Sequence, residues 1–317
     1  VVARLISGIT SASVTVANAY IADIYPPDRR AGAFGMLGAC FGIGFIIGPA
    51  LGGYLGDIDP RLPFYVASGL SLANFAYGFF VLPESHPVHL REKFRWKSTN
   101  PWAAMMWLRE KPGLSAMAVI QFLKNLAHSA LPTVFVFYLQ QRFGWSLTII
   151  GLALTAVGIG AVIVEGGLSG YLVRRLGAGR AMLYSIMAGV VGFLLMGLAV
   201  YEWMFILAII PMSFWGVSRS ASQAIASARV SAEDQGKLQG SLNAVIVLSG
   251  MVGPLLFSWV FGATVNHSLL LQGAAFMMAA LALGLSLPLA WVFRGVKITA
   301  ATPPIPAKKK AKNYEVA

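Results

Sequence analysis

Long apolar blocks make up most of the chain, and short polar stretches separate them. Each block has about 20 residues or more, which is the length that an α-helix needs to cross a hydrocarbon core of about 30 Å. The pattern therefore predicts an all-α polytopic membrane protein. We expect nine membrane-spanning helices, over residues 1–24, 33–56, 63–83, 113–139, 147–173, 181–201, 203–225, 239–263 and 269–293.

The polar stretches divide the chain into four parts. Residues 1–83 hold the first three predicted helices, and residues 84–112 form one long polar loop. Residues 113–293 hold six more helices. Residues 294–317 form a basic tail, rich in Pro and Ala, which we expect to be disordered because it has too few large apolar residues to form a core.

The basic residues mark one side of the membrane. Of the 24 Lys and Arg, 19 fall in alternate loops and in the tail, whereas the opposite loops hold only Arg61 and Arg142. Short cytoplasmic loops carry an excess of Lys and Arg. We therefore expect a multi-pass protein of the cell (inner) membrane, with the long loop and the C-terminus in the cytoplasm.

Composition excludes several other classes of protein. The chain of 317 residues is 57% hydrophobic and 11% charged, whereas a soluble domain has about 25% charged residues. The net charge of +12 comes from loop residues, so we expect no nucleic-acid partner. Cys40 is the single cysteine, and we find no zinc spacing, nucleophile elbow or phosphate loop. We expect no enzyme activity, no metal and no cofactor.

The segment Gly44–Gly53 carries four glycines and one proline in ten residues. These residues weaken a helix in water, but in lipid an unpaired backbone amide is so costly that the segment stays helical. We expect Gly44, Gly48 and Gly52 to share one face and to let a neighbouring helix approach closely. Pro49 is expected to bend the helix, because it removes a backbone hydrogen bond.

Short motifs follow one another in a recognisable order along the chain. They are Arg4-xxx-Gly8, Tyr20-Ile-Ala-Asp23, Arg29-Arg30, the segment Gly44–Gly53, Leu82-Pro83-Glu84-Ser85, Gln235–Leu242 and Gly253-Pro254. Their order resembles the major facilitator superfamily and, within it, the tetracycline/H⁺ antiporters. Gly253-Pro254 also repeat the Gly-Pro theme at the matching place in the second half, which suggests internal pseudosymmetry.

The resemblance implies a major facilitator fold with two six-helix bundles, of which nine of the twelve helices are present here. It implies proton-coupled efflux of small amphipathic drugs, such as tetracycline, by alternating access, with the proton as the coupling ion. The partners it implies are a small-molecule substrate and the lipid bilayer, in a monomer. Since the chain begins with Val rather than Met, we expect three helices upstream, and we expect residues 1–317 alone not to transport.

The chain departs from the tetracycline exporters at four positions. These proteins carry a His and a Gln in the eighth helix and an Asp in the ninth. A gapless alignment places Ala161, Glu165 and Gly189 there. In the tenth helix, an apolar position of the family corresponds to Arg219. These departures concern both the substrate and the proton route in the second half.

Ionisable residues inside membrane helices are costly, so each is a candidate for function. Glu165, Arg219 and Lys124 are such residues in the last six helices. We expect Glu165 to pair with Arg219 or Lys124 and to be the protonatable group of this half; a static ion pair that fixes packing is the alternative. Arg4 matches the family motif and is a fourth candidate, with an interfacial, snorkelling arginine as the alternative.

Polar residues in the same helices are candidates for the substrate cavity. Gln121, Asn125 and His128 lie four and three residues apart and form one stripe. Weaker candidates of the same kind are Gln223, Asn243 and Asn18. Hydrogen bonding between helices is the alternative for all six. Near the cytoplasmic end of the first helix, we expect Asp23 to cap the helix or to pair with Arg29 or Arg30 in the following loop.

Two other functions stay open on the sequence alone. The first is a proton-coupled or facilitated transporter of a metabolite, in which the charged residues are structural. The second is a transport-inactive membrane receptor or scaffold. Inward proton-coupled uptake would distinguish the first from an exporter, and ligand binding that is insensitive to pH and to changes at Glu165 would indicate the second.

Overall fold

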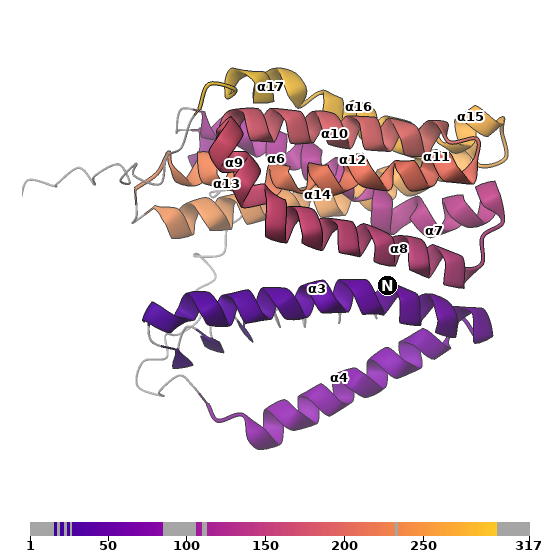
Figure 1. The fold of residues 1–317 in the computed structure, drawn as a ribbon, viewed down its shortest axis with the longest axis horizontal. Coiled ribbons are helices and arrows are strands. Elements are labelled where there is room, and N and C mark those ends of the chain that lie inside the picture. Colours follow the sequence, from indigo (N-terminus) through magenta and orange to yellow (C-terminus); the bar gives the residue numbers. More distant parts are fainter. Residues whose placement is uncertain are drawn as a thin grey trace, which may run out of the picture.

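A computed structural model describes residues 16–17, 20–21, 24–25, 27–84, 106–109, 113–231 and 234–296. The regular elements in these ranges are all helices. Helices from residues 113–296 form one bundle, α3 (Pro27–Ile58) lies along its side, and α4 (Leu62–Val81) diverges from α3 (Figure 1). Most of the predicted helix 1–24, most of the loop 84–112 and residues 297–317 lie outside the described residues.

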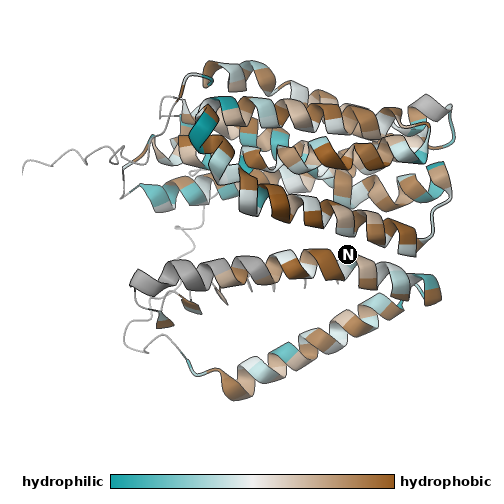
Figure 2. Cartoon of the chain, in the orientation of Figure 1, coloured by the Kyte–Doolittle hydropathy of each residue, from teal (hydrophilic) through white to brown (hydrophobic). Residues whose placement is uncertain are grey.

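The prediction of an all-α polytopic membrane protein is confirmed. In the described residues, seven helical segments are long and apolar enough to cross a membrane. Hydrophobic residues cover the middle of these helices, and more hydrophilic residues lie toward their ends (Figure 2). The count of nine membrane helices stays a prediction, and so does the division into four parts.

The start of α3 differs from the prediction. Arg29 and Arg30 were assigned to a loop before residue 33, but the helix begins at Pro27. A proline in the first helical turn has the right backbone angle and lacks an N–H group that would be unpaired there. Polar composition therefore indicated a loop where the backbone continues as helix. The side chains of Arg29 and Arg30 are not among those described.

Three predicted single helices are interrupted. The predicted helix 113–139 is divided into α6 (Leu114–His128) and α7 (Ala130–Phe143). The predicted helix 203–225 is divided into α11 (Glu202–Leu207), α12 (Ile209–Trp215) and α13 (Val217–Ser227). The predicted helix 269–293 is divided into α15 (Leu269–Gln272), α16 (Ala274–Gly284) and α17 (Leu287–Val292). Several breaks lie a few residues before a proline, namely Pro132, Pro211 or Pro288. A proline cannot donate to the carbonyl four residues earlier, so the helix loses its regular bonding there.

The core of the bundle is aromatic and lies around α10 (Ala178–Leu198). Phe193, Phe205 and Phe276 are fully buried with Tyr138, and the Tyr138 ring lies 5.0 Å from that of Phe276 in an edge-on arrangement. The Tyr138 hydroxyl donates to the Met196 carbonyl at 2.9 Å. The one polar group in this cluster is therefore satisfied, which favours its burial.

Helix α3 packs against α8 (Leu147–Ala161) through glycines, and Figure 1 shows the two helices side by side. A Cβ atom on Gly53 would collide with the Leu147 carbonyl and would lie 3.1 Å from the Gly151 Cα, and a Cβ on Gly151 would collide with the Pro49 carbonyl. Only glycine permits this approach of two backbones. We call this contact the α3–α8 joint.

The joint corrects one detail of the sequence analysis. Among the described residues, nothing lies within 4 Å of a Cβ built on Gly44, Gly48 or Gly52. The close approach falls on Gly53 instead, one position further along the helix. The pattern of glycines predicted a tight helix contact correctly, but the rotation of α3 about its axis decides which glycines make it. The motif thus joins a helix from residues 1–83 to a helix from residues 113–293.

The second Gly-Pro motif packs within the bundle. It lies in α14 (Gln235–Thr264), which continues through Pro254. A Cβ on Gly253 would lie 2.7 Å from the Ser129 Cβ, at the break between α6 and α7. The Ser129 hydroxyl donates to the Leu126 carbonyl at 2.6 Å, so the helix break keeps its polar groups paired.

Candidate functional site

Lys124 is buried inside the six-helix bundle and is only 6% exposed. Its ammonium donates to the Ser218 carbonyl at 3.0 Å and to the Ser222 hydroxyl at 3.1 Å, both on α13. Both acceptors are neutral, so they solvate the charge without cancelling it. A charge near the middle of a membrane helix costs about 2.5–3.5 kcal/mol or more, which makes a purely space-filling role for Lys124 expensive.

Glu165 lies in a stretch of π-helix, η3 (Val162–Leu168), between α8 and α9 (Ser169–Leu176). A π-helix adds a residue to the turn, costs stability and is frequent at functional sites. The carboxyl group packs against Gly216, where any Cβ would collide with its Oε1 atom. Gly216 therefore leaves room for the carboxylate at the junction of α12 and α13, and Glu165 stays exposed in the described structure.

Arg219 follows Ser218 on α13 and is also exposed. The charges of Arg219 and Glu165 both act on Lys124, so the three groups share one electrostatic environment. In this structure Lys124 bonds to Ser218 and Ser222 rather than to Glu165, and the pairing of Glu165 with Arg219 or Lys124 stays a prediction. We call Lys124, Glu165 and Arg219 the charged triad.

The predicted polar stripe lies on α6 beside Lys124. The Asn125 side-chain amide donates to the Gln121 carbonyl at 2.8 Å, and both residues are partly buried. His128 is exposed, and its ring lies 5.8 Å from the ring of Trp215. Asn125 thus makes a contact within its own helix rather than a bond between helices, which leaves the cavity interpretation open.

The other predicted site residues are placed only in part. Gln223 is partly buried on α13, and Asn243 is exposed on α14. Arg4, Asn18 and Asp23 lie outside the described residues, so the structure does not bear on them.

Gly189 has a structural reason to lack the carboxylate of the tetracycline exporters. A Cβ at this position would lie 2.7 Å from the Leu283 Cδ2 and 2.7 Å from the Trp215 Cγ. The indole of Trp215, 7% exposed, therefore occupies the space that a larger side chain at position 189 would need. The family's Asp and this Trp exclude each other on steric grounds.

Asp57 makes a polar contact that the sequence analysis missed. This residue ends the glycine-rich α3, and its two carboxylate oxygens accept bonds from the backbone N–H groups of Leu147 and Thr148, each at 2.8 Å. The first N–H groups of a helix lack partners within the helix and favour negative charge. Asp57 thus caps α8 from the other side of the α3–α8 joint. An acidic residue directly after a glycine-rich helix was the available signal.

Other site features gave no signal in the sequence. Ser218 and Ser222 are ordinary small residues that become important only because α13 lies against Lys124. Trp215 resembles any membrane tryptophan until its contact with Gly189 is known. The π-helix leaves no mark in the hydrophobic pattern. Neighbours from distant parts of the chain define the first two features, and a local change of backbone bonding defines the third.

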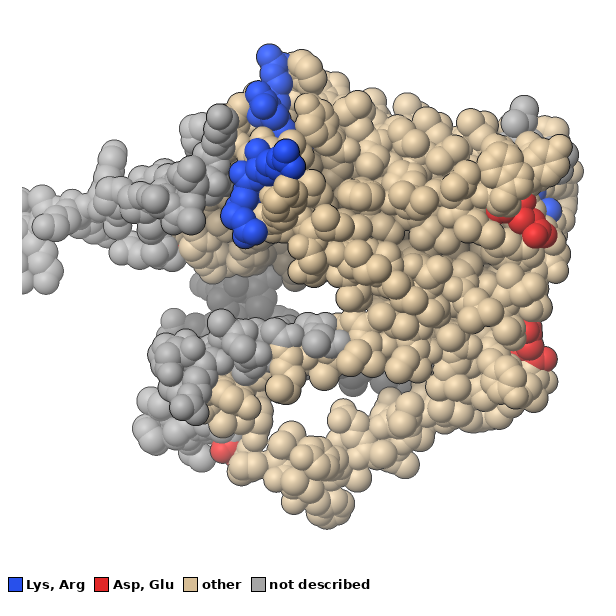
Figure 3. All heavy atoms as spheres, in the orientation of Figure 1, with Lys and Arg blue, Asp and Glu red and all other residues tan. Residues whose placement is uncertain are grey.

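On the face that Figure 3 shows, charged side chains lie toward the two ends of the molecule and none lies across the middle of the bundle. Lys and Arg gather over α9 at one end, acidic groups and a basic group lie at the opposite end, and a further acidic group lies near the end of α4. Lys124 differs from these surface charges because it is buried inside the bundle. Helices long enough to span a membrane, charges held within the bundle and a close-packed joint between two groups of helices are together typical of a membrane transporter.

Comparison with known families narrows this class. The model of the Major Facilitator Superfamily matches residues 1–201 and, separately, residues 117–315, so the chain belongs to this superfamily. Residues 117–201 fit the model in both matches, as expected for a fold whose two halves repeat. The family consists of membrane transporters rather than enzymes.

Its sequence relatives include tetracycline resistance proteins. The class G protein of Vibrio anguillarum is 36% identical over 83% of this chain and 67% of its own length. The class C protein of Escherichia coli is 34% identical, over 83% of this chain and 66% of its own length, and the class E protein is 32% identical, over 82% and 64%. The chain thus spans about two thirds of the length of these relatives.

Two solved structures share the fold. The human organic anion transporter MFSD10 (TETRAN) superposes with a TM-score of 0.63 at 22% identity, over 90% of this chain and 70% of the other. A bacterial homologue of the human lysosomal transporter Spinster, in an inward-facing and unoccupied conformation, gives a TM-score of 0.56 at 16% identity, over 88% and 73%. At these identities the likeness concerns the fold alone.

Proposed function

We propose that the full-length protein is a secondary transporter that exports small amphipathic drugs, of the tetracycline type, in exchange for protons. The halves move against each other at the α3–α8 joint, and the substrate site opens alternately to each side of the membrane. The names of the tetracycline resistance relatives, at up to 36% identity, support this class of substrate. Glu165 is the protonatable group in the described part of the chain.

The charged triad is the observation that carries the proposal. The charge of Glu165 acts on the buried Lys124, yet Lys124 bonds to neutral groups of α13 instead, and Glu165 lies in a stretch of π-helix. A carboxylate used only for packing is normally locked by its partners. One that is free to take a proton or to meet a cationic group of a substrate can couple the two events.

The coupling follows from charge. With Glu165 ionised, the site attracts a positively charged group on the substrate. Once Glu165 binds a proton, that attraction is lost, and the substrate is released. Because proton and substrate compete for one carboxylate, they move in opposite directions across the membrane.

The test uses the full-length protein in inverted membrane vesicles. A pH gradient is imposed, a tetracycline and a panel of lipophilic cations are added one by one, and proton release is recorded with each. Glu165→Gln removes the titration and keeps the shape of the side chain. We expect wild type to release protons on drug addition, and we expect the variant to fold at wild-type levels and to lose at least about 90% of this signal.

Two results would change the proposal. Drug-driven proton release that survives in Glu165→Gln would keep the antiporter but exclude Glu165 as its coupling group. An absence of proton movement with every drug in wild type would reject drug/proton exchange itself. Lys237→Gln serves as the matched control, because Lys237 lies over the Trp107 ring at the end of the bundle and away from the triad.

The balance of charge in the triad favours a second candidate, a proton-linked carrier of organic anions. Within the membrane part of the described bundle, Lys124 and Arg219 outnumber Glu165. An anion would bind beside the two cations, and protonation of Glu165 would strengthen its binding by removing a repulsion. Proton and anion would then move together, as in a metabolite symporter.

The same vesicles separate the two candidates by the sign of the pH change. Without an imposed gradient, a drug that enters the vesicle in exchange for protons makes the interior more alkaline. An anion that enters with protons makes it more acidic. Acidification with lipophilic anions, and no response to cations, would replace the first proposal by the second.

A further inference from the structure

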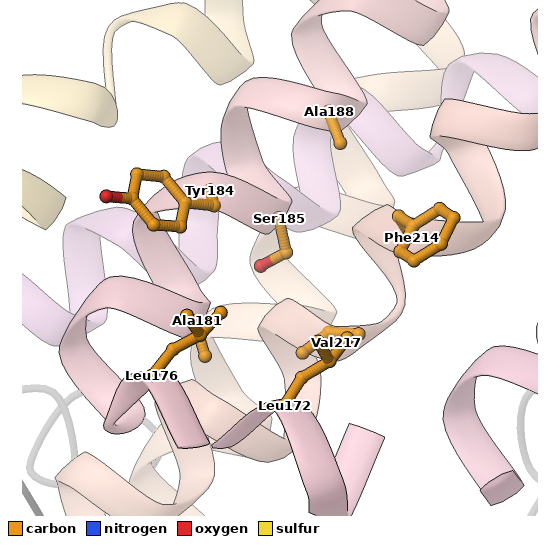
Figure 4. A pocket seen from close by; sticks show the side chains of 8 residues that line it. All are labelled: Leu172, Leu176, Ala181, Tyr184, Ser185, Ala188, Phe214 and Val217. Carbon is orange, nitrogen blue, oxygen red and sulfur yellow. The ribbon is translucent and has the colours of Figure 1, made fainter. Parts of the chain in front are cut away.

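A small apolar pocket lies between α9, α10 and the α12–α13 junction, apart from the charged triad (Figure 4). Leu172 and Leu176 line it from α9, Tyr184 and Ser185 from α10, and Phe214 and Val217 from the third side. The Ser185 hydroxyl donates to the Met182 carbonyl within its own helix at 2.9 Å, so it offers no free proton to a ligand. In Figure 4 the Tyr184 hydroxyl points away from the other lining side chains.

The volume of the pocket limits what it can hold. It measures about 190 Å³, whereas sites for drug-sized ligands measure about 300–1,000 Å³. The pocket is therefore too small for a whole drug molecule, and its lining cannot orient a polar one. It suits part of a flexible apolar chain.

Three arginines lie next to this pocket in the sequence and in space. Arg174 and Arg175 form the last turn of α9 between the lining residues Leu172 and Leu176, and Arg180 directly precedes the lining residue Ala181. Figure 3 shows basic side chains gathered over α9. The apolar pocket thus has a positively charged rim at one end of the bundle.

Two arginines of the rim, Arg174 and Arg180, differ from the other cations at this end. Arg229, Lys237 and Arg294 each lie over an aromatic ring. Arg175 of the rim also lies over a ring, that of Tyr171, and donates to its hydroxyl at 2.7 Å. For Arg174 and Arg180, the described residues provide neither a ring nor a hydrogen-bond acceptor, and no described carboxylate pairs with the rim. No group of the described residues thus competes for these two guanidinium groups, and guanidinium binds phosphate well.

We infer that this pocket and its rim bind an anionic phospholipid of the bilayer. The phosphate of the headgroup lies against Arg174 and Arg180, and one acyl chain enters the pocket between α9, α10 and the α12–α13 junction. Basic pockets between membrane helices bind anionic headgroups by the same physics. The occupant would hold α9, which directly follows the π-helix of Glu165, against its neighbours.

The test measures lipid binding by the purified full-length protein in detergent, with native mass spectrometry as the readout. Phosphatidylglycerol and phosphatidylcholine with identical acyl chains are titrated in parallel. We expect one phosphatidylglycerol to bind at least about tenfold more tightly than phosphatidylcholine. In Arg174→Gln/Arg180→Gln this preference is expected to vanish, since each cation near a membrane surface contributes about a fivefold preference for an anionic headgroup.

Two further variants separate the rim from the pocket. Ala188→Phe fills the pocket and should weaken the binding of both lipids, whereas Val191→Phe, at an exposed position one turn further along α10, should change neither. Lys237→Gln removes a cation at the same end and should leave the preference intact. Equal binding of the two lipids by wild type, a preference that survives in the double arginine variant, or unchanged binding in Ala188→Phe would each overturn the inference.

Discussion

The α3–α8 joint and the charged triad differ in how their polar groups are paired. At the joint, backbones meet at Gly53 and Gly151, and polar groups are paired: the Thr155 hydroxyl donates to the Ile46 carbonyl at 2.8 Å, and Asp57 caps α8. In the triad, three charges share one electrostatic environment, and Lys124 bonds to neutral groups of α13 rather than to Glu165. The joint is therefore built to keep its geometry, and the triad is built to respond to a proton or a ligand.

The two regions depend on different properties of their side chains. Contact at the joint depends on the absence of side chains at Gly53 and Gly151, so a substitution at either position would cause a steric clash. The triad depends on charge in a region of low dielectric constant, where small movements change the electrostatic energy strongly. Steric changes should therefore break the joint, whereas isosteric changes of charge should break the triad.

Gly53→Leu is the variant with the largest expected effect. The new side chain would collide with the Leu147 carbonyl, which is backbone and cannot rotate away. Overpacking of a close contact costs about 1–3 kcal/mol or more, so we expect the protein level in the membrane and drug transport to fall at least about tenfold. Both are measured by immunoblot and by drug accumulation in cells.

Gly48→Leu is the matched control for this variant. In the described residues, open space surrounds a Cβ at Gly48, so the same side chain on the same helix should be tolerated better. Equal loss in the two variants would mean that the general helix chemistry of glycine, rather than the joint, causes the defect.

Lys124→Met tests whether the buried charge of the triad serves function. The variant loses two hydrogen bonds from a charged donor, each worth about 1.5–3 kcal/mol, but it also loses a charge that costs at least about 2.5–3.5 kcal/mol at the helix centre. Because these two contributions are of similar size, we expect a Tm in detergent close to that of wild type and at least about a tenfold loss of transport. A lower Tm with retained transport would assign Lys124 to packing, and Lys237→Met serves as the surface control.

Asp57→Asn should have a smaller effect, on the conformational equilibrium of the joint. It weakens the cap on α8, and changes at helix caps cost about 0.5–2 kcal/mol. The population in which this end of the joint is separated should therefore rise about two- to thirtyfold. Spin labels at Tyr54 and Ile149, both exposed, report the distance across the joint in a Cys40→Ser background.

Asp59→Asn is the comparison for that measurement. Asp59 lies two residues from Asp57, but its carboxylate accepts only a local bond from the Arg61 N–H at 2.8 Å. Its variant should leave the distance distribution unchanged. An identical distribution in Asp57→Asn and wild type would show that the cap does not hold the joint closed.

Hydrophobic blocks predicted most of the described helices well. The block 33–56 corresponds to Pro27–Ile58, and the block 147–173 corresponds to a helical segment that ends at Leu176. Length and hydropathy suffice here, because in lipid the backbone must bond within its own helix. The prediction missed the break at Ser129 and the π-helix at Glu165, because both keep the average hydropathy and change only the local bonding.

By itself, the sequence determined that this is a membrane protein and that its membrane segments are helices. It also determined that the chain resembles one transporter superfamily, and which few charged residues lie in the membrane helices. Each of these follows from composition along a single segment and from the cost of polar groups in lipid. Only the tertiary structure decided that Gly53 meets α8, that Asp57 caps it, that Lys124 is held by Ser218 and Ser222, and that Trp215 fills the space beside Gly189. These contacts depend on the rotation and the register of helices that lie far apart in the chain, and hydropathy carries no record of either.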